Sequence, residues 1–279
     1  MGFRQDGGIM KRFIAILAAL SLLILTGCAD TPAESPSISE SMPPSADMPG
    51  STSSASDALV EDNKEYRSAA DKVVMTSDIS YERLISDAVP TLAADSINAT
   101  VATLAANLRL SADLRGEEAI NDHKNNSSLA AYYEVQEIVL AHVCEKSVSY
   151  TIRSTVYSGG MHAQDSDTTL NFDAQTGKQL SLDDIFDVTA DIYLPRLHAE
   201  ILRIIDAEKL TAEPTEFLYY ENYAEVLTAN FFTDKWYLTD DTLYLIYQPY
   251  EIAPYTAGVI TFAVPYSNIA DILENTQVG

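Results

Sequence analysis

The sequence predicts an α+β fold, with antiparallel β-sheet and helices packed on one side of it. Three observations support this class. Apolar residues recur at helical spacing in two long segments, strand-like runs follow one another around turns, and the regular strand-to-helix crossover of a parallel sheet is missing. We expect two closely associated subdomains, a smaller one over residues 66 to 145 and a second over residues 146 to 279.

Two long amphipathic helices are predicted, over residues 93 to 115 and 191 to 209. Pro195 is compatible with the second because it falls in the first turn, where no backbone N–H is needed. Shorter helices are expected over residues 215 to 230 and from Ser267 onward. The apolar positions that define the first helix are Ile97, Val101, Leu104 and Leu108.

Strands are predicted where apolar and polar residues alternate. The first covers residues 79 to 86, and the runs over 131 to 145 and 147 to 157 should be antiparallel neighbours. After a return strand and a short helix capped by Ser181 and Asp184, the chain forms further strands in "KWYLTDDTLYLIYQ" and "GVITFAVPY". Gly159, Gly160 and Gly177 are expected to supply the positive φ values of the turns between strands.

The N-terminus combines a basic start, an apolar run and a cysteine. The apolar run covers residues 13 to 25 and ends in "LTGC" at Cys28. Such a run is too short to span roughly 30 Å of hydrocarbon as a helix rising about 1.5 Å per residue. The pattern is typical of a lipoprotein signal peptide over residues 1 to 27, after which Cys28 carries acyl chains of the palmitate type. We therefore expect a protein anchored by lipid to the outer face of the bacterial cytoplasmic membrane.

Residues 28 to 65 differ in composition from the rest of the chain. They are rich in Pro, Ser, Ala and acidic residues and poor in large apolar ones. A segment of this kind cannot bury enough surface to offset its chain entropy. We expect a disordered linker that holds the folded part away from the membrane.

The chain is strongly acidic, with a net charge of -24. Such a charge repels nucleic acid, so no nucleic-acid partner is expected. It attracts basic proteins at long range, although an acidic surface also serves solubility.

Cysteine use is minimal, because Cys144 is the only cysteine besides Cys28. His142 lies on the same face of the same predicted strand. The pair suits a nucleophile or half of a zinc site, or a small buried thiol, and no further ligand appears at metal spacing. We predict no metal and no cofactor.

Few other motifs suggest chemistry. The chain has no GxSxG, phosphate-binding glycine loop or HExxH motif. Glu251, in "QPYEIAPYTAG", is the one carboxylate in an aromatic-rich setting. An enzyme acting on glycan would use it as one of two carboxylates. We treat this enzyme as the alternative to a non-catalytic protein.

Two long segments carry a resemblance to a known family. They are "YSGGMHAQDSDTTLNFDAQTGKQLSLDDIF" and "WYLTDDTLYLIYQPYEIAPYTAGVITFAVPYSNIADIL". They resemble the RsiV-like extracellular region shared by membrane-anchored anti-sigma factors that sense lysozyme and by the non-catalytic part of certain peptidoglycan deacetylases. The resemblance runs over about residues 130 to 273. It implies a receptor-like domain without catalysis of its own.

The chain departs from both kinds of relative. A sensor would carry a cytoplasmic sigma-binding segment and a full transmembrane helix, and a deacetylase would carry a catalytic domain after this region. We therefore expect a binding module for an envelope ligand, either a basic protein such as lysozyme or cell-wall glycan. The alternative is a peptidoglycan-active hydrolase or a deacetylase-associated accessory protein.

The stretch "QPYEIAPYTAG" is the main candidate for ligand contact. Pro249 and Pro254 interrupt strand pairing and stiffen the loop, and Gly258 begins the next strand. The candidate binding residues are His162, Tyr250, Glu251 and Tyr255. The alternative is that both tyrosine rings pack inward and that Glu251 caps backbone N–H groups of the turn.

Overall fold

The computed structural model describes residues 58–211, 217–231 and 233–274, and contains two sheets. The predicted signal peptide, Cys28 and most of the predicted linker lie outside the described residues. The linker was predicted to reach residue 65, but the first strand already begins at Leu59. Among the described helices, none is both long and apolar enough to cross a membrane.

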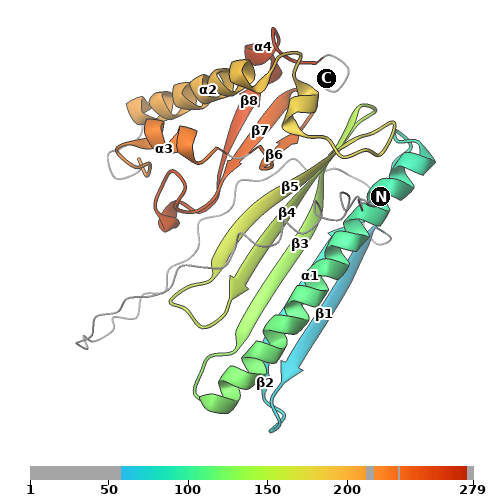
Figure 1. Cartoon of the computed structure of the whole chain (residues 1–279), viewed down its shortest axis with the longest axis vertical. Coiled ribbons are helices and arrows are strands. Elements are labelled where there is room, and N and C mark those ends of the chain that lie inside the picture. The colour runs from blue at the N-terminus through green and yellow to red at the C-terminus, as the bar shows by residue number, and fades with distance from the viewer. Residues whose placement is uncertain (1–57, 212–216, 232, 275–279) are drawn as a thin grey trace, which may run out of the picture. The chain divides into compact units, whose positions relative to one another are not determined.

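The first sheet has five strands in the order β1-β2-β3-β4-β5. All neighbours pair antiparallel except β2 and β3, which are parallel and joined through helix α1, Thr91–Asn125 (Figure 1). This parallel pair is the exception to the predicted antiparallel sheet. The strands are β1 Leu59–Arg67, β2 Val73–Glu82, β3 Tyr132–Val143, β4 Ser147–Tyr157 and β5 Gln164–Asp173.

Helix α1 packs on one face of this sheet through small side chains. Its buried positions recur mostly four residues apart, so they form one stripe along the helix. The helix is longer than the predicted 93 to 115, because the buried stripe continues through Ala112, Gly116 and Ala119. Small residues such as these contribute little to a pattern of apolar residues, so the sequence did not indicate this part of the helix. Small residues let the helix axis approach the sheet closely, and Ile79, Ile138 and Tyr150 fill the space from the sheet side.

The second sheet has three antiparallel strands in the order β6-β7-β8. It packs with α2 around the largest core of the described chain, in which Trp236, Tyr247 and Phe262 are buried. Its elements are the 3-10 helix η1 Leu182–Ile185, α2 Ala190–Thr211, α3 Tyr223–Ala229, β6 Trp236–Leu238, β7 Thr242–Tyr247, the 3-10 helix η2 Tyr255–Ala257, β8 Ile260–Pro265 and α4 Tyr266–Ile269. The α+β class is confirmed.

Two expectations about boundaries are wrong. The boundary predicted between residues 145 and 146 falls between β3 and β4, which pair along most of their length. The helix predicted over residues 215 to 230 is reduced to α3. In the described part before α3, Phe217 and Tyr219 pack against the core and the Tyr220 N–H donates to the carbonyl of Ile252, so this stretch is held by the β7–β8 loop instead.

Hydrogen bonds join the two sheets at the end of β4 and β5. The Asn171 amide donates to the carbonyl of Trp236 at 2.7 Å, and the Ser149 hydroxyl accepts the Leu238 N–H at 3.2 Å. The Thr169 hydroxyl accepts the Trp236 N–H at 3.2 Å. Buried polar residues of the first sheet therefore satisfy the edge strand of the second.

Candidate functional site

Three aromatic rings stack where the β4–β5 turn meets the β7–β8 loop, both on the left of the view in Figure 1. The rings of His162 and Tyr255 lie 4.1 Å apart between centroids, at 25° to each other. Tyr250 stacks on Tyr255 at 5.7 Å and 30°. His162 is exposed, and 57% of Tyr250 is exposed. We call His162, Tyr250 and Tyr255 the ring stack.

The ring stack rests on an unusual backbone conformation at Tyr250. Its φ is 70°, in the left-handed region that bulky residues rarely adopt. The Tyr250 N–H donates to the carbonyl of Ala253 at 3.1 Å, which closes the turn. Strained positions of this kind persist where the surrounding structure enforces them, and they cluster at binding and catalytic sites. Two prolines, Pro249 and Pro254, flank the strained turn.

Tyr255 is fixed by hydrogen bonds from its hydroxyl. The hydroxyl donates to the carbonyl of Ala163 at 3.0 Å and to Asp165 Oδ2 at 3.2 Å. Partial burial and the Asp165 carboxylate raise the pKa of Tyr255, so its phenol stays protonated as a donor. The ring therefore presents one face to His162 while its edge is held against β5.

Glu251 has a different position from the rings. Its Oε2 accepts the Gln248 N–H at 2.6 Å, and its Oε1 pairs with Lys235. Only 16% of the Glu251 side chain is exposed. This is the capping role that the sequence left as an alternative. The structure thus brings His162, Tyr250 and Tyr255 together and uses the Glu251 carboxylate to hold their loop.

The turn residues behave largely as the sequence predicts. Gly159, Gly177 and Gly258 have φ of 91°, 70° and 67°. Gly160 is not among the positive-φ glycines of the described residues, so that expectation is wrong for this position. A Cβ at Gly159 would also lie 3.1 Å from the ring of Tyr132, so glycine suits this turn for its space as well.

The face of the five-stranded sheet opposite α1 continues from the ring stack. Glu134 contacts α1 through Arg115, so its neighbours Tyr133 and Val135 point to the other face. Tyr133 stacks on Tyr157 at 5.5 Å, and the Tyr133 phenol contributes to the raised pKa of Tyr255. We call this surface the open face; by strand register it includes Glu61, Glu65, Asp78, Tyr133, Val135, Glu137, Arg153, Thr155, Tyr157, Asp165 and Asp167.

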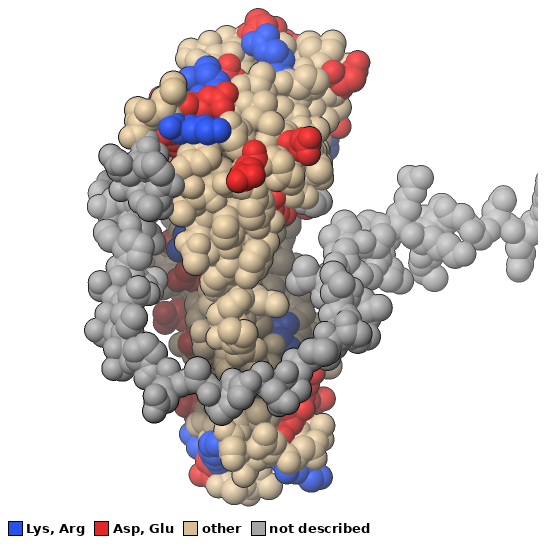
Figure 2. Space-filling view, turned by 90° about the vertical axis from the view of Figure 1, so that its left-hand side faces the viewer, with Lys and Arg blue, Asp and Glu red and all other residues tan. Residues whose placement is uncertain are grey.

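The open face is acidic and linked to the ring stack by Asp165. Its carboxylate accepts the Thr155 hydroxyl at 2.7 Å as well as that of Tyr255. Carboxylates from all four neighbouring strands share the face with Arg153, whose guanidinium lies 3.8 Å from Asp167 and 3.9 Å from Glu137. On the face in Figure 2, acidic and basic residues gather in the upper and lower parts of the view, and other residues occupy most of the middle.

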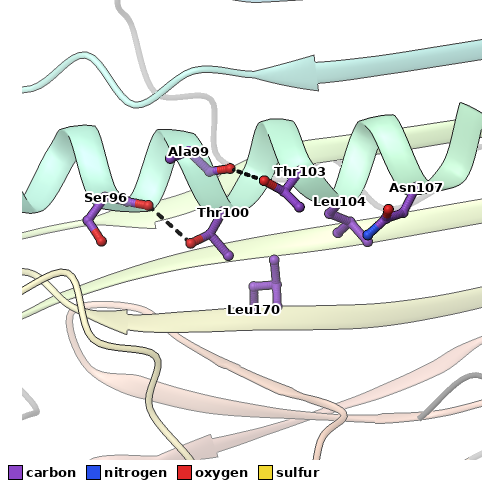
Figure 3. A pocket seen from close by; sticks show the side chains of 7 residues that line it. All are labelled: Ser96, Ala99, Thr100, Thr103, Leu104, Asn107 and Leu170. Atoms are coloured by element: carbon purple, nitrogen blue, oxygen red, sulfur yellow. Dashed lines mark hydrogen bonds between the residues drawn. The ribbon is translucent and has the colours of Figure 1, made fainter. Parts of the chain in front are cut away.

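A groove lies between α1 and β5 (Figure 3). It encloses about 510 Å³ and is widely open to solvent. The Thr100 and Thr103 hydroxyls donate to the carbonyls of Ser96 and Ala99, four residues earlier. The lining residues include no charged side chain, and two of the polar ones, Thr100 and Thr103, direct their hydroxyls to the backbone of their own helix, so little in the groove would orient a ligand.

In the structure a third residue with a metal-binding atom lies beside Cys144 and His142, and the sequence did not indicate it. Asp240 in the β6–β7 turn lies beside it, 96 residues from Cys144 (240 minus 144). The His142 imidazole and the backbone N–H groups of Lys146 and Ser147 lower the pKa of Cys144 to about 6, although partial burial opposes them. Sequence spacing gives no signal for a contact between two hairpin ends in different sheets.

Comparison with known proteins finds a likeness between a C-terminal segment and one family model. Residues 183–267 match DUF3298, a family of proteins of unknown function. This segment contains Tyr250, Glu251 and Tyr255, whereas His162 precedes it. No curated protein matches the chain.

Solved structures of this family have a similar fold. A DUF3298 member from Bacteroides fragilis is 22% identical with a TM-score of 0.55, and the match covers 78% of this chain and 93% of that chain. A DUF3298 protein from Pseudomonas aeruginosa is 16% identical with a TM-score of 0.52, covering 79% and 95%. At these identities the likeness concerns the fold alone.

Proposed function

We propose that this chain is a lipid-anchored extracellular protein whose folded part binds a basic protein of the lysozyme class, without catalysis of its own. The single observation that carries the proposal is the ring stack beside the acidic open face. The two surfaces meet at Asp165, which accepts hydroxyls from both. A partner could contact them together.

Charge supports a basic partner. The chain carries a net charge of -24, and carboxylates from β1, β2 and β3 share the open face. Complementary charge accelerates encounter and suppresses wrong partners more than it adds affinity. The affinity must therefore come from a smaller set of desolvated contacts, for which the ring stack is suited.

The ring stack supports binding because its rings are fixed before any partner arrives. Tyr250 and Tyr255 are amphipathic, and the loop holds them at the cost of a strained φ. Tyrosine is enriched among residues that dominate interface affinity, and arginine is a favourable partner for an exposed ring face. Preorganised rings lose little conformational entropy on binding.

Cell-wall glycan is the second candidate ligand. The rings of His162 and Tyr250, which both stack on Tyr255, could also offer their outer faces to sugar rings. The enzymatic alternative, a hydrolase or a deacetylase-associated protein, would have to release Glu251 from Gln248 and Lys235 before its carboxylate could act. The binding proposal needs no such rearrangement.

The test is calorimetric titration of the purified chain with lysozyme, and separately with soluble peptidoglycan fragments. We expect lysozyme to bind and Tyr250→Ala to weaken its Kd by about tenfold or more, since a central aromatic contributes at least about 1.4 kcal/mol. Binding should weaken as salt is raised. The matched control is Leu92→Ala, which removes an 86% exposed side chain from α1 and should leave Kd within about twofold.

Three outcomes distinguish the alternatives. Absence of heat with lysozyme, or equal affinity for Tyr250→Ala and the parent chain, rejects the protein ligand. Fragment binding that depends on Tyr250, without lysozyme binding, makes glycan the ligand. Turnover of glycan that is lost in Glu251→Gln while binding persists replaces the binding module with an enzyme.

A further inference from the structure

Three side chains with metal-binding atoms converge where the β3–β4 hairpin meets the β6–β7 turn. His142 and Cys144 come from the end of β3, and Asp240 comes from the turn between β6 and β7. One ligand atom from each residue lies within 4.8 Å of the other two. The His142 Nε2 is 3.6 Å from Asp240 Oδ1.

Local backbone structure aims these side chains at one point. The β3–β4 register shifts between Leu140 and His142, and a bulge of this kind re-aims the side chains that follow it. The Cys144 N–H donates to the Ser147 carbonyl at 3.0 Å, while the Ser147 N–H points to the Cys144 sulfur at 3.4 Å. The hairpin end thus fixes the position of the thiol.

The opposing turn is fixed by Tyr266. Its backbone N–H donates to the carbonyl of Asp241 at 2.8 Å, and its hydroxyl donates to the carbonyl of Thr239 at 2.7 Å. These bonds hold the residues on either side of Asp240, whose side chain is 85% exposed and free to rotate. The carboxylate can therefore adjust its distance to the other two groups without moving the backbone.

His142 supplies the observation that points to a ligand. Only 12% of its side chain is exposed, and its Nε2 is buried without a hydrogen-bond partner among the described residues. A buried polar atom without a partner has lost its hydrogen bonds to water without compensation. Coordination of an ion would satisfy this nitrogen.

We propose that His142, Cys144 and Asp240 bind one divalent transition-metal ion of the zinc class, with water completing the coordination. Thiolate, imidazole and carboxylate are all zinc ligands, whereas a thiolate disfavours calcium and magnesium. In a tetrahedral zinc site neighbouring ligand atoms lie about 3.3 to 3.6 Å apart, given bond lengths of about 2.0 to 2.3 Å. The observed His142 to Asp240 distance is already in this range.

The geometry favours an ion over a cysteine nucleophile. A catalytic Cys, His and Asp arrangement uses the two ring nitrogens on opposite sides of the imidazole, one for the thiol and one for the carboxylate. Here one histidine atom lies within 4.8 Å of both the sulfur and the carboxylate oxygen. An ion at this point would also join the hairpin end of the five-stranded sheet to the turn of the three-stranded sheet.

The test uses the full chain without a histidine tag, freed of metal and titrated with zinc chloride. We expect one ion per chain. Cys144→Ser and Asp240→Asn should each weaken the Kd by about tenfold or more, because even residues that only support a metal ligand contribute 10–100-fold. Zinc should also raise the thermal unfolding midpoint of the parent chain and much less that of the two variants, because an ion that binds only the folded state stabilises it.

Matched controls isolate the site. Asp241→Asn changes the neighbouring acid in the same turn, and Cys28→Ser replaces the other cysteine; both should leave the Kd within about twofold. With cobalt in place of zinc, a thiolate-to-metal charge-transfer band should be present in the parent chain and absent in Cys144→Ser. Because the exposed Asp240 is not a core residue, Asp240→Asn tests the site even if Cys144→Ser fails to fold.

Two results would overturn the proposal. The first is that zinc does not bind to the folded parent chain. The second is that zinc binds equally to the parent chain, to Cys144→Ser and to Asp240→Asn, or is lost in Cys28→Ser instead.

Discussion

The hydrophobic cores next to the two sheets differ in the size of their side chains. Between α1 and the five-stranded sheet, the helix contributes mainly small residues, among them Ala112 at 0% exposure. Between α2 and the three-stranded sheet, the core is dominated by rings and long aliphatic side chains, including Trp236 and Tyr247 at 1%. The first core relies on close approach of helix and sheet, whereas the second relies on the bulk of its side chains.

The difference extends to buried charge. In the five-stranded region Glu134 is fully buried, accepting from the Ser77 hydroxyl at 2.6 Å and from Arg115 Nε at 2.6 Å. Among the described residues of the three-stranded region, the buried polar residue is the uncharged Thr242, and the Lys235–Glu251 pair keeps 13% and 16% of its side chains exposed. The core that contains the small residues of α1 also contains the buried Glu134 with its partner Arg115. Loss of one partner would leave the other charge buried without compensation. The following predictions test this contrast, beginning with the largest expected effect.

Removing the partner of the buried carboxylate should cost the most. Arg115→Met keeps the apolar stem but leaves Glu134 buried without its counter-ion, and we expect a loss of about 3–5 kcal/mol in the free energy of unfolding. Denaturant titration measures it. The double variant Arg115→Met with Glu134→Gln should recover much of the loss, because the uncompensated charge is gone. A double variant as unstable as the single one would show that lost packing, and not buried charge, is responsible.

The sequence anticipated much of the fold because its signals are local. The alternation in β3 and β4 and the helical spacing of Ile97, Val101 and Leu104 depend only on neighbours along the chain, and these elements form as predicted. The sequence also predicted β3 and β4 to be antiparallel neighbours, and this pairing is confirmed. The predicted boundary between subdomains therefore lies between two paired strands of one sheet.

The candidate site was accessible from sequence only in part. "YEIAPY" indicated an aromatic loop, and "SGGMH" indicated the turn that bears His162, but their contact across two sheets is tertiary. The capping role of Glu251 was an open alternative that only coordinates could decide. Asp240 was missed because its neighbour Asp241 makes the pair resemble an ordinary polar turn.

Because α1 lies close to the five-stranded sheet, we expect that a single methyl group added to the buried side of α1 destabilises the chain. A Cβ added at Gly116 would lie 2.1 Å from the ring of Tyr66, far inside any contact distance. Gly116→Ala should therefore destabilise the chain by about 1–3 kcal/mol, although alanine is favoured over glycine in a helix by about 1 kcal/mol. Thermal or denaturant unfolding measures the change. Gly160→Ala is the control, since its added Cβ would meet only the His162 carbonyl at 3.6 Å and should change stability by less than about 0.5 kcal/mol. A stabilised Gly116→Ala chain would mean that α1 can move away from β1.

The smallest effect is expected at the edge of the second core, where Asp184 caps η1. Its Oδ2 accepts the Ser181 N–H at 2.7 Å and the Ser181 hydroxyl at 2.6 Å, and these bonds hold the pKa of Asp184 below its ordinary value of 3.8. Asp184→Ala should cost about 1 kcal/mol near neutral pH, the usual contribution of a cap.

The pH dependence of this loss follows from the direction of the pKa shift. Because the folded-state pKa of Asp184 is depressed, its contribution is fully present above the unfolded-state pKa and is lost as pH falls through the folded-state value. The difference in unfolding free energy between the parent chain and Asp184→Ala should therefore be constant above about pH 5 and shrink as the solution is acidified below 3.8. If the difference stays constant into strong acid, the loss in Asp184→Ala comes from altered packing of η1 against the aromatic core and not from the charge of Asp184. The stability of η1 would then depend on side-chain bulk, as that of the core does.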